Sequence, residues 1–454
     1  MRTLDHWQPE NSEFWATKGR QIARRNLWIS VFALMLAFAI WQVWSVTVVK
    51  LPSIGFRYSA NQLFWLAAIP ALSGATLRIF YSFVIPFFGG QRWTAFSTAT
   101  LLIPAIGIGI AVQNPQTPYS TMLILALLCG FGGANFSSSM SNISYFFPKK
   151  EKGGALGING GLGNLGVSVV QLVIPLIITV GVFGVLGGKP QVIMQNGIET
   201  KIWLQNAGYI WVPFILLSTL LAFFGMDNIA GQNRSIKSQL VIFKRPHTWL
   251  LCWVYIGAFG SFIGFSAAFP LLTSQSFPAI DPIKLAFIGP FLGAIGRVIG
   301  GMLSDKIRPS FVTAFSYIMM IIGVIGVILF LPKNGSAGSF IGFFISFLFL
   351  FAFSGIASGS VFAQAPRVFM QSHQYKTKDP ALAEQKAIQE SATVVGFMGA
   401  VGAFGGFFIP KSFGSSIAAT GSAELALIIF IIFYLSCLLL NYGFYTRRKA
   451  ITKC

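Results

Sequence analysis

Twelve apolar runs, each long enough to cross a membrane, recur along the chain with short polar breaks between them. A helix needs about 20 predominantly apolar residues to span a hydrocarbon core about 30 Å thick. Because backbone polar groups must be satisfied inside lipid, runs of this length predict transmembrane helices. The runs cover residues 27–49, 63–88, 93–113, 120–147, 153–183, 209–226, 249–272, 285–303, 310–332, 338–363, 388–410 and 421–445. We therefore predict an all-α membrane protein with twelve spans.

A polar stretch near the middle of the chain separates these runs into two sets of six. It contains Arg234, Lys237, Lys244 and Arg245, and its composition is typical of a linker. The predicted organisation is a cytoplasmic N-terminal segment over 1–26, a six-helix bundle over 27–226, a cytoplasmic linker over 227–248, a second six-helix bundle over 249–445 and a cytoplasmic tail over 446–454.

The chain carries a formal net charge of +20, although only 10% of its residues are charged. Such a low charged fraction excludes an ordinary soluble enzyme, in which about a quarter of the residues are charged. Short cytoplasmic loops are enriched in Lys and Arg. With the N-terminus inside, most of the 32 cations fall in inside segments, and the outside loops hold Lys50, Arg57, Lys189, Lys201, Lys284, Lys333 and Lys411. The charge therefore indicates topology and contact with membrane lipid, and we expect no nucleic-acid partner.

Two sequence patterns that occur once in each half indicate that the halves are related. The second span contains Gly74-Ala75-Thr76-Leu77-Arg78 and the eighth contains Gly293-Ala294-Ile295-Gly296-Arg297, which share a GAxxR pattern. Four glycines at intervals of three residues recur in the fifth and eleventh spans: Gly157, Gly160, Gly163 and Gly166, and Gly396, Gly399, Gly402 and Gly405. Each pattern lies in spans at equivalent places in the two halves, as expected of a transporter built from internal repeats.

Arg78 and Arg297 are the only ionisable residues that fall well inside the predicted spans. A charge at this depth costs about 2.5–3.5 kcal/mol by insertion scales, and it usually marks a functional site. A structural arginine would need a buried carboxylate or helix carbonyls. All 12 Asp and Glu residues lie in loops, tails or span ends, so the sequence offers no carboxylate at that depth.

Two guanidinium groups on equivalent helices would repel each other across a central cavity unless an anion lay between them. A guanidinium is planar, stays charged at physiological pH and presents a fork of donors that suits a planar oxyanion better than a lysine would. Nitrate, nitrite, carboxylates and bicarbonate all meet this description. The residues alone thus predict a transporter of small planar anions.

Other spans supply residues that would line a substrate cavity, and for each of them ordinary helix packing or contact with lipid is the alternative. The glycine repeats at spacing three would let neighbouring helices approach closely, or would let a helix bend. Asn164 lies among the first set of glycines, and its amide can donate to an anion. The aromatic residues Phe136, Tyr255 and Phe259 would wall a cavity or, in a chain with 46 Phe, simply face lipid.

The loop after the eighth span reads Gly300-Gly301-Met302-Leu303-Ser304-Asp305-Lys306. It resembles the major facilitator superfamily loop of the form GG-x-LSD-[KR], which lies between the second and third helices of a half. The equivalent first-half loop, Phe88-Gly89-Gly90-Gln91-Arg92, keeps the glycines and the cation and lacks the aspartate. The resemblance implies the fold of that superfamily, two six-helix bundles around a central substrate site.

Longer motifs are similar to those of the nitrate/nitrite porter family within this superfamily. GGLGNLGVSVVQ at 160–171 and GAVGAFGGFFIPK at 399–411 resemble its two nitrate-signature motifs. Further similarity lies in GATLRIFYSF at 74–83, GGQRWTAFSTA at 89–99, GFGGANFSSSMSNISYFFPK at 130–149 and FGSFIGFSA at 259–267. The resemblance extends over nearly the whole chain.

This resemblance assigns expected roles to individual residues. It implies that Arg78 and Arg297 clasp the anion, that Phe136 sandwiches it, and that Tyr255, Phe259, Asn164 and Ser358 line the site. The glycines of the two signature motifs are expected to let their helices bend during transport; they are Gly160, Gly163, Gly166, Gly399, Gly402 and Gly405.

The predicted function is exchange of nitrate and nitrite across a bacterial inner membrane by alternating access. Proton-coupled nitrate uptake is an alternative within the same class. An anion channel would need a continuous polar lining, and the spans hold too few polar residues for one. A membrane enzyme would need His, acid or Cys groups gathered at mid-depth, and although Cys129, Cys252 and Cys437 lie within the apolar runs, these runs contain no redox ligand cluster. We expect a monomer. We expect no cofactor or metal, since the cysteines form no CxxC pair and His6, His247 and His373 lie outside the predicted spans.

Overall fold

The computed structural model describes residues 3–195, 198–230, 240–333, 336–376, 379–448, 450, 452 and 454. Among these residues, 12 helices are long and apolar enough to cross a membrane, which confirms the predicted all-α class. The spans are Ser12–Lys50, Ala60–Tyr81, Gly90–Ala111, Tyr119–Phe146, Lys149–Ile177, Asn206–Gly225, Pro246–Ser276, Pro282–Lys306, Pro309–Phe330, Phe340–Tyr375, Pro380–Thr420 and Glu424–Thr446.

Several spans are built from consecutive helices because the hydrogen-bonding pattern changes within them. The helices of the first half, within the spans and between them, are α1 (Ser12–Phe14), η1 (Trp15–Gly19), α2 (Arg20–Gln42), α3 (Trp44–Lys50), η2 (Pro52–Ile54), α4 (Ala60–Tyr81), α5 (Ile85–Phe88), α6 (Gly90–Ala99), α7 (Leu102–Ala111), α8 (Tyr119–Phe146), α9 (Lys149–Ile177), η3 (Gly184–Gly187), α10 (Asn206–Tyr209) and α11 (Trp211–Gly225). The strands are β1 (Thr3–Leu4), β2 (Gln191–Gln195), β3 (Ile198–Ile202) and β4 (Asn228–Ile229).

The second half continues with the same mixture of long helices and short turns. Its elements are η4 (Leu240–Lys244), α13 (Pro246–Tyr255), η5 (Ile256–Gly260), α14 (Ser261–Ser276), η6 (Pro282–Lys284), α15 (Ile288–Lys306), α16 (Pro309–Phe330), α17 (Phe340–Lys376), α18 (Pro380–Ala403), α19 (Gly405–Thr420), α20 (Glu424–Asn441) and η7 (Tyr442–Thr446). Of these, η5 and η7 are π-helical turns.

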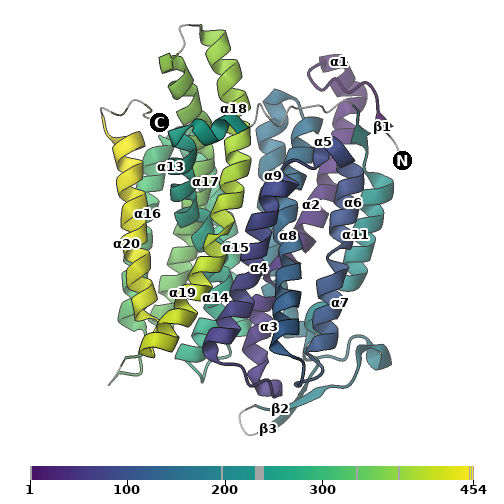
Figure 1. Ribbon diagram of the computed structural model, residues 1–454, viewed down its shortest axis with the longest axis vertical. Coiled ribbons are helices and arrows are strands. Elements are labelled where there is room, and N and C mark those ends of the chain that lie inside the picture. Colours follow the sequence, from purple (N-terminus) through teal and green to yellow (C-terminus); the bar gives the residue numbers. More distant parts are fainter. Residues whose placement is uncertain are drawn as a thin grey trace. The chain divides into compact units, whose positions relative to one another are not determined.

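Backbone contacts divide the chain into two compact units. The first unit comprises Met1–Arg234, Ser266–Ser274 and Asp281–Phe287, and the second comprises Ser235–Phe265, Gln275–Ile280 and Ile288–Cys454. In the first unit α4 packs along α8, and α2 packs along both α8 and α9; in the second, α17 packs along α15 and α16 (Figure 1). Residues 231–239 of the predicted linker lie outside the described residues.

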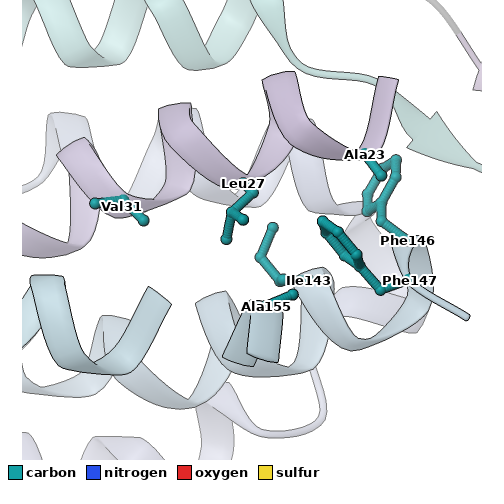
Figure 2. Packing of buried hydrophobic residues seen from close by; sticks show 7 residues of the cluster. All are labelled: Ala23, Leu27, Val31, Ile143, Phe146, Phe147 and Ala155. Atoms are coloured by element: carbon teal, nitrogen blue, oxygen red, sulfur yellow. The ribbon is translucent and has the colours of Figure 1, made fainter. Parts of the chain in front are cut away.

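One end of the first unit has an apolar cluster where α2, α8 and α9 meet. Figure 2 shows its buried members, which are Ala23, Leu27, Val31, Ile143, Phe146, Phe147 and Ala155. Two tryptophans of the N-terminal segment, Trp7 and Trp15, pack against this cluster. Burial of the indole rings adds apolar contact at a helix end that would otherwise face water.

Polar contacts hold the same N-terminal segment in place. Trp7 Nε1 donates to the carbonyl of Tyr145 at 3.1 Å, and Trp15 Nε1 donates to Glu151 Oε1 at 2.9 Å. The amide of Lys149, the first residue of α9, donates to Glu10 Oε1 at 2.9 Å. A carboxylate at a helix N-terminus complements the helix dipole. The segment therefore caps α9, the helix that carries the first signature motif.

In the second unit, the helices α17 and α18 continue beyond the apolar runs that predicted them. Their polar turns are stabilised by pairing, because Glu390 accepts two hydrogen bonds from Arg245 at 2.9 and 2.8 Å and lies 3.1 Å from His373 Nε2. Hydrogen bonding to Glu390 raises the pKa of the Arg245 guanidinium above its ordinary value. Polar side chains with buried partners thus extend helices that apolar periodicity alone ends too early.

Candidate functional site

Arg78 is completely buried in the first unit, near the C-terminal end of α4. Its Nε donates to the carbonyl oxygen of Gly133 on α8 at 2.7 Å. This bond joins α4 to α8, which pack along each other, and it fixes the Nε end of the guanidinium relative to α8.

Aromatic rings surround the rest of this guanidinium. The Arg78 Cζ lies 4.8 Å from the ring centroid of Phe136 on α8, 4.9 Å from that of Trp41 on α2 and 5.8 Å from that of Phe38 on α2. Ring faces carry negative electrostatic potential, so these distances correspond to favourable cation–π contacts. The structure thus brings the predicted residue Phe136 to Arg78. Trp41 and Phe38 were not predicted, because nothing in the run 27–49 distinguishes its inward rings from its lipid-facing ones.

Arg297 has a comparable surrounding in the second unit, on α15. Its Cζ lies 5.3 Å from the ring centroid of Phe259 and 4.7 Å from that of Phe362 on α17. The atom Nη1 is buried, and it has no hydrogen-bond partner among the described residues. The structure therefore brings together Arg297 and the predicted Phe259, and it adds Phe362, which the sequence analysis missed.

The π-helical turn η5 interrupts the seventh span at the aromatic residues of this site. Tyr255 is the last residue of α13, and its ring is stacked on that of Phe259 with centroids 5.5 Å apart and planes 8° apart. The ring centroid of Phe362 lies 4.9 Å from that of Tyr255. π-Helical turns inside α-helices are frequent at functional sites, because the extra residue re-aims the side chains that follow it. Phe259 thus lies within the turn that faces Arg297.

Asn164 is buried on α9, and neither its amide nitrogen nor its amide oxygen has a hydrogen-bond partner among the described residues. It lies one turn after Gly160, where an added Cβ would lie 3.4 Å from the Phe136 ring. Residues four apart share a helix face, so Asn164 lies on the face of α9 that meets Phe136. Buried polar groups in native proteins are almost always hydrogen-bonded, so this amide is suited to a water or a bound anion.

Ser358 is buried on α17, one turn before Phe362. Its hydroxyl donates to the carbonyl of Ser354 at 2.8 Å within the helix. The spacing puts Ser358 on the face that carries Phe362. Its assignment to the substrate site stays a prediction, as does that of the other lining residues.

The signature glycines allow close approaches between helices. A Cβ at Gly163 would lie 2.7 Å from the side chain of Leu34, and one at Gly166 would lie 2.0 Å from the carbonyl oxygen of Met35, both on α2. A Cβ at Gly402 would lie 2.5 Å from the Tyr255 ring, and one at Gly405 would lie 2.3 Å from the Cα of Gly260. These positions must be glycine for packing reasons. A role of Gly160, Gly163, Gly166, Gly399, Gly402 and Gly405 in conformational change stays a prediction.

The two units repeat one arrangement with different side chains. In each, an arginine on the second span of a half contacts an aromatic ring from the first span and another from the fourth: Trp41 and Phe136 for Arg78, and Phe259 and Phe362 for Arg297. Equivalent helices of the two halves therefore supply an arginine and two aromatic rings each, in agreement with the repeated sequence patterns. Such an arrangement can hold a charged group at membrane depth while leaving donors for a ligand.

Comparison with known proteins gives concordant results. The Major Facilitator Superfamily family pattern matches residues 27–410. The chain is 50% identical to the nitrate/nitrite transporter NarU of Escherichia coli strain K12 over 98% of this chain and 96% of that protein. It is 40% identical to the probable nitrate/nitrite antiporter NarK2 of Thermus thermophilus over 99% of this chain and 98% of that protein.

Solved structures share the fold at low sequence identity. A D-xylose–proton symporter aligns with a TM-score of 0.68 at 15% identity, covering 92% of this chain and 97% of that one. A bacterial homologue of the lysosomal transporter Spinster aligns with a TM-score of 0.66 at 16% identity, covering 94% of this chain and 97% of that one. These structures show the fold alone. The twelve spans, the family match and the relatives at 50% and 40% identity show that the chain is a multi-pass membrane protein of the nitrate/nitrite porter family within the major facilitator superfamily.

Proposed function

We propose that the protein exchanges nitrate and nitrite across a bacterial inner membrane, with both termini in the cytoplasm. The observation that supports this most is the repeated arrangement of an intramembrane arginine against aromatic rings, once in each unit. The names of relatives at 50% and 40% identity supply the substrates, since the residues alone favour any small planar oxyanion. The protein acts as a transporter and not as an enzyme, and it works as a monomer.

Arg78 and Arg297 together clasp one anion in this proposal. The guanidinium of Arg297 contacts two rings and donates to no described residue, so its fork of donors is available to a planar oxyanion. Phe136 and Phe259 form flat apolar walls that exclude water. In a medium of low dielectric, each charge-assisted hydrogen bond is stronger than it would be in water.

Alternating access moves this site between the two sides of the membrane. Without an anion, the two positive charges would repel each other as the site closes; a bound anion offsets that repulsion. Reorientation is therefore fast when loaded and slow when empty, which produces exchange. Coupling to protons would need a side chain that gains and loses a proton in each cycle, and a guanidinium is by its general chemistry unsuited to that task.

Counterflow in proteoliposomes tests the proposal. Vesicles are loaded with nitrite, with nitrate or with an impermeant buffer alone, and the entry of labelled nitrate is measured in each. Exchange predicts rapid entry into the nitrite- and nitrate-loaded vesicles and slow entry into the empty ones. Equal entry into all three would contradict exchange, and entry that grows linearly with nitrate concentration without saturating would favour an anion channel.

A further inference from the structure

Trp41 is closely enclosed in the first unit. Its indole Nε1 donates to the carbonyl of Pro70 at 2.8 Å, and the side chain is 1% exposed. A Cβ at Gly74 would lie 2.8 Å from the indole nitrogen, and a Cβ at Gly133 would lie 2.5 Å from the ring carbon Cε2. The indole therefore occupies a slot between α4 and α8 that exists only because both residues are glycine.

The same slot determines where Arg78 can lie. Gly74 and Arg78 are one helical turn apart, so they share the face of α4 that the indole covers. Gly133 contributes twice, since its missing side chain admits the indole and its carbonyl accepts the hydrogen bond from Arg78 Nε. With Phe136 as a further ring contact, the guanidinium is fixed by aromatic contacts and by a carbonyl at its base.

Among the described residues, no carbonyl accepts a hydrogen bond from Arg297 as that of Gly133 does from Arg78. Its ring contacts are Phe259 and Phe362, its guanidinium donates to no described residue, and it is only partly buried. The two arginines therefore differ in how firmly the protein holds them, although they occupy equivalent helices.

We propose that Trp41 is a positioning residue that fixes the guanidinium plane of Arg78. This inference rests on the proposed function, in which Arg78 binds the anion. A fixed plane matters because bidentate donation to a planar oxyanion requires the guanidinium and the anion to be coplanar. A tetrahedral anion can also place two oxygens in that plane, but its other two project out of it toward the rings that cover the guanidinium, whereas a planar anion has none there. Trp41 therefore contributes both to affinity and to discrimination between planar and tetrahedral anions.

The test compares Trp41→Leu and Trp41→Phe with Trp44→Phe in nitrite-loaded proteoliposomes. Trp44 is a matched control, since it is also fully buried in the first span and its ring is not one of those that we find over the Arg78 guanidinium among the described residues. Two quantities are measured: the half-saturation concentration for labelled nitrate, and the ratio of inhibition by planar nitrate to inhibition by tetrahedral perchlorate. Arg78→Lys is assayed in parallel.

We expect Trp41→Leu to raise the half-saturation concentration about tenfold, with little change in the maximal rate per folded protein, and to lower the nitrate-to-perchlorate ratio. Trp41→Phe keeps a ring beneath the guanidinium but loses the bond to Pro70, so its half-saturation concentration should rise only about threefold. Trp44→Phe should resemble the wild type in both quantities. A purely structural Trp41 would lower yield or thermal stability and leave the ratio unchanged.

The outcomes separate this inference from the function on which it rests. Wild-type half-saturation and selectivity in Trp41→Leu, together with an inactive Arg78→Lys, would overturn the role of Trp41 alone. Normal nitrate transport by Arg78→Lys would overturn the clasp and the positioning role together. If Trp41→Leu does not reach the membrane, Trp41→Phe decides the matter, because identical behaviour of Trp41→Phe and Trp44→Phe also refutes the proposal.

Discussion

A buried arginine needs neighbours that tolerate its charge without neutralising it. A carboxylate would satisfy Arg78 or Arg297 fully and would compete with any anionic ligand. Aromatic faces attract the cation more weakly, and they have no lone pairs with which to occupy its donors. The ring contacts at 4.7–5.3 Å of Arg297 thus stabilise the charge and leave its hydrogen-bonding capacity in place.

Replacing either arginine by lysine tests whether geometry matters beyond charge. Arg78→Lys and Arg297→Lys should each reduce nitrate exchange at least about tenfold, because lysine keeps the charge and loses the planar fork. The measurement is labelled nitrate uptake per folded transporter, with folding followed by size-exclusion profile. Near-normal uptake by both variants would show that charge alone suffices.

Phe136 tests the importance of the apolar wall. Phe136→Ala removes a ring 4.8 Å from Arg78 Cζ and admits water beside the guanidinium. The half-saturation concentration for nitrate should rise about tenfold while the amount of folded protein stays similar. Phe136→Leu, which keeps apolar bulk without a π-face, separates water exclusion from the cation–π contact. An unchanged half-saturation concentration in Phe136→Ala, combined with loss of binding in Phe259→Ala, would show that the wall belongs to the other ring.

At the scale of the helix, glycines in one motif have different physical roles. On α9, Gly163 abuts Leu34 of α2, whereas a Cβ at Gly157 would have no atom within 4 Å. Packing therefore explains Gly163 and does not explain Gly157. We expect that a helix face of small residues next to an unconstrained stretch would let part of α9 stay docked while another part bends.

The pair Gly163→Val and Gly157→Val tests this division on a single helix. Gly163→Val should push α9 away from α2, with overpacking that costs about 1–3 kcal/mol, and should block most nitrate exchange while nitrate-dependent thermal stabilisation persists. Gly157→Val meets no neighbour, so exchange lost there would instead indicate a need for backbone bending. Equal exchange by Gly163→Val and the wild type would rule out the packing role.

The sequence predicts the helices far better than their inward faces. Twelve spans follow from apolar length, because a membrane imposes that length on any spanning helix. The ring contact of Trp41 with Arg78 and that of Phe362 with Arg297 could not be predicted, since aromatic side chains are as compatible with lipid as with a cavity. The π-helical turn η5 leaves no compositional trace, and it determines where Phe259 lies. Arg78 and Arg297 were identifiable because a charge inside a span is rare enough to require a function.

At the scale of the whole molecule, the proposed exchange depends on what the spans lack as well as on what they contain. Glu390, which lies near the start of a span, is already bound to Arg245 and close to His373. It is therefore engaged in holding α13, α17 and α18 together, and it is a poor candidate for carrying protons with each transport cycle.

Transport should consequently be insensitive to a proton gradient. In nitrite-loaded vesicles, an inward pH gradient should change initial nitrate entry by less than about twofold, because one-for-one exchange of monovalent anions moves no proton. Glu390→Gln should leave this insensitivity unchanged and should lower thermal stability. Gradient-driven accumulation of nitrate in anion-free vesicles would instead support proton symport, and its loss in Glu390→Gln would identify the proton carrier.

The N-terminal segment that caps α9 has a consequence for how the chain is made. Trp7, Glu10 and Trp15 bind partners that lie 138, 139 and 136 residues later in the chain. At about 5–20 residues per second, a ribosome needs roughly 7–30 s to synthesise that interval. During this time the indoles and the carboxylate have no native partner, and four spans must enter the bilayer before α9 exists. Trp7, Glu10 and Trp15 therefore reach their final contacts only after α9 has been made, and these contacts report when the first five spans have assembled.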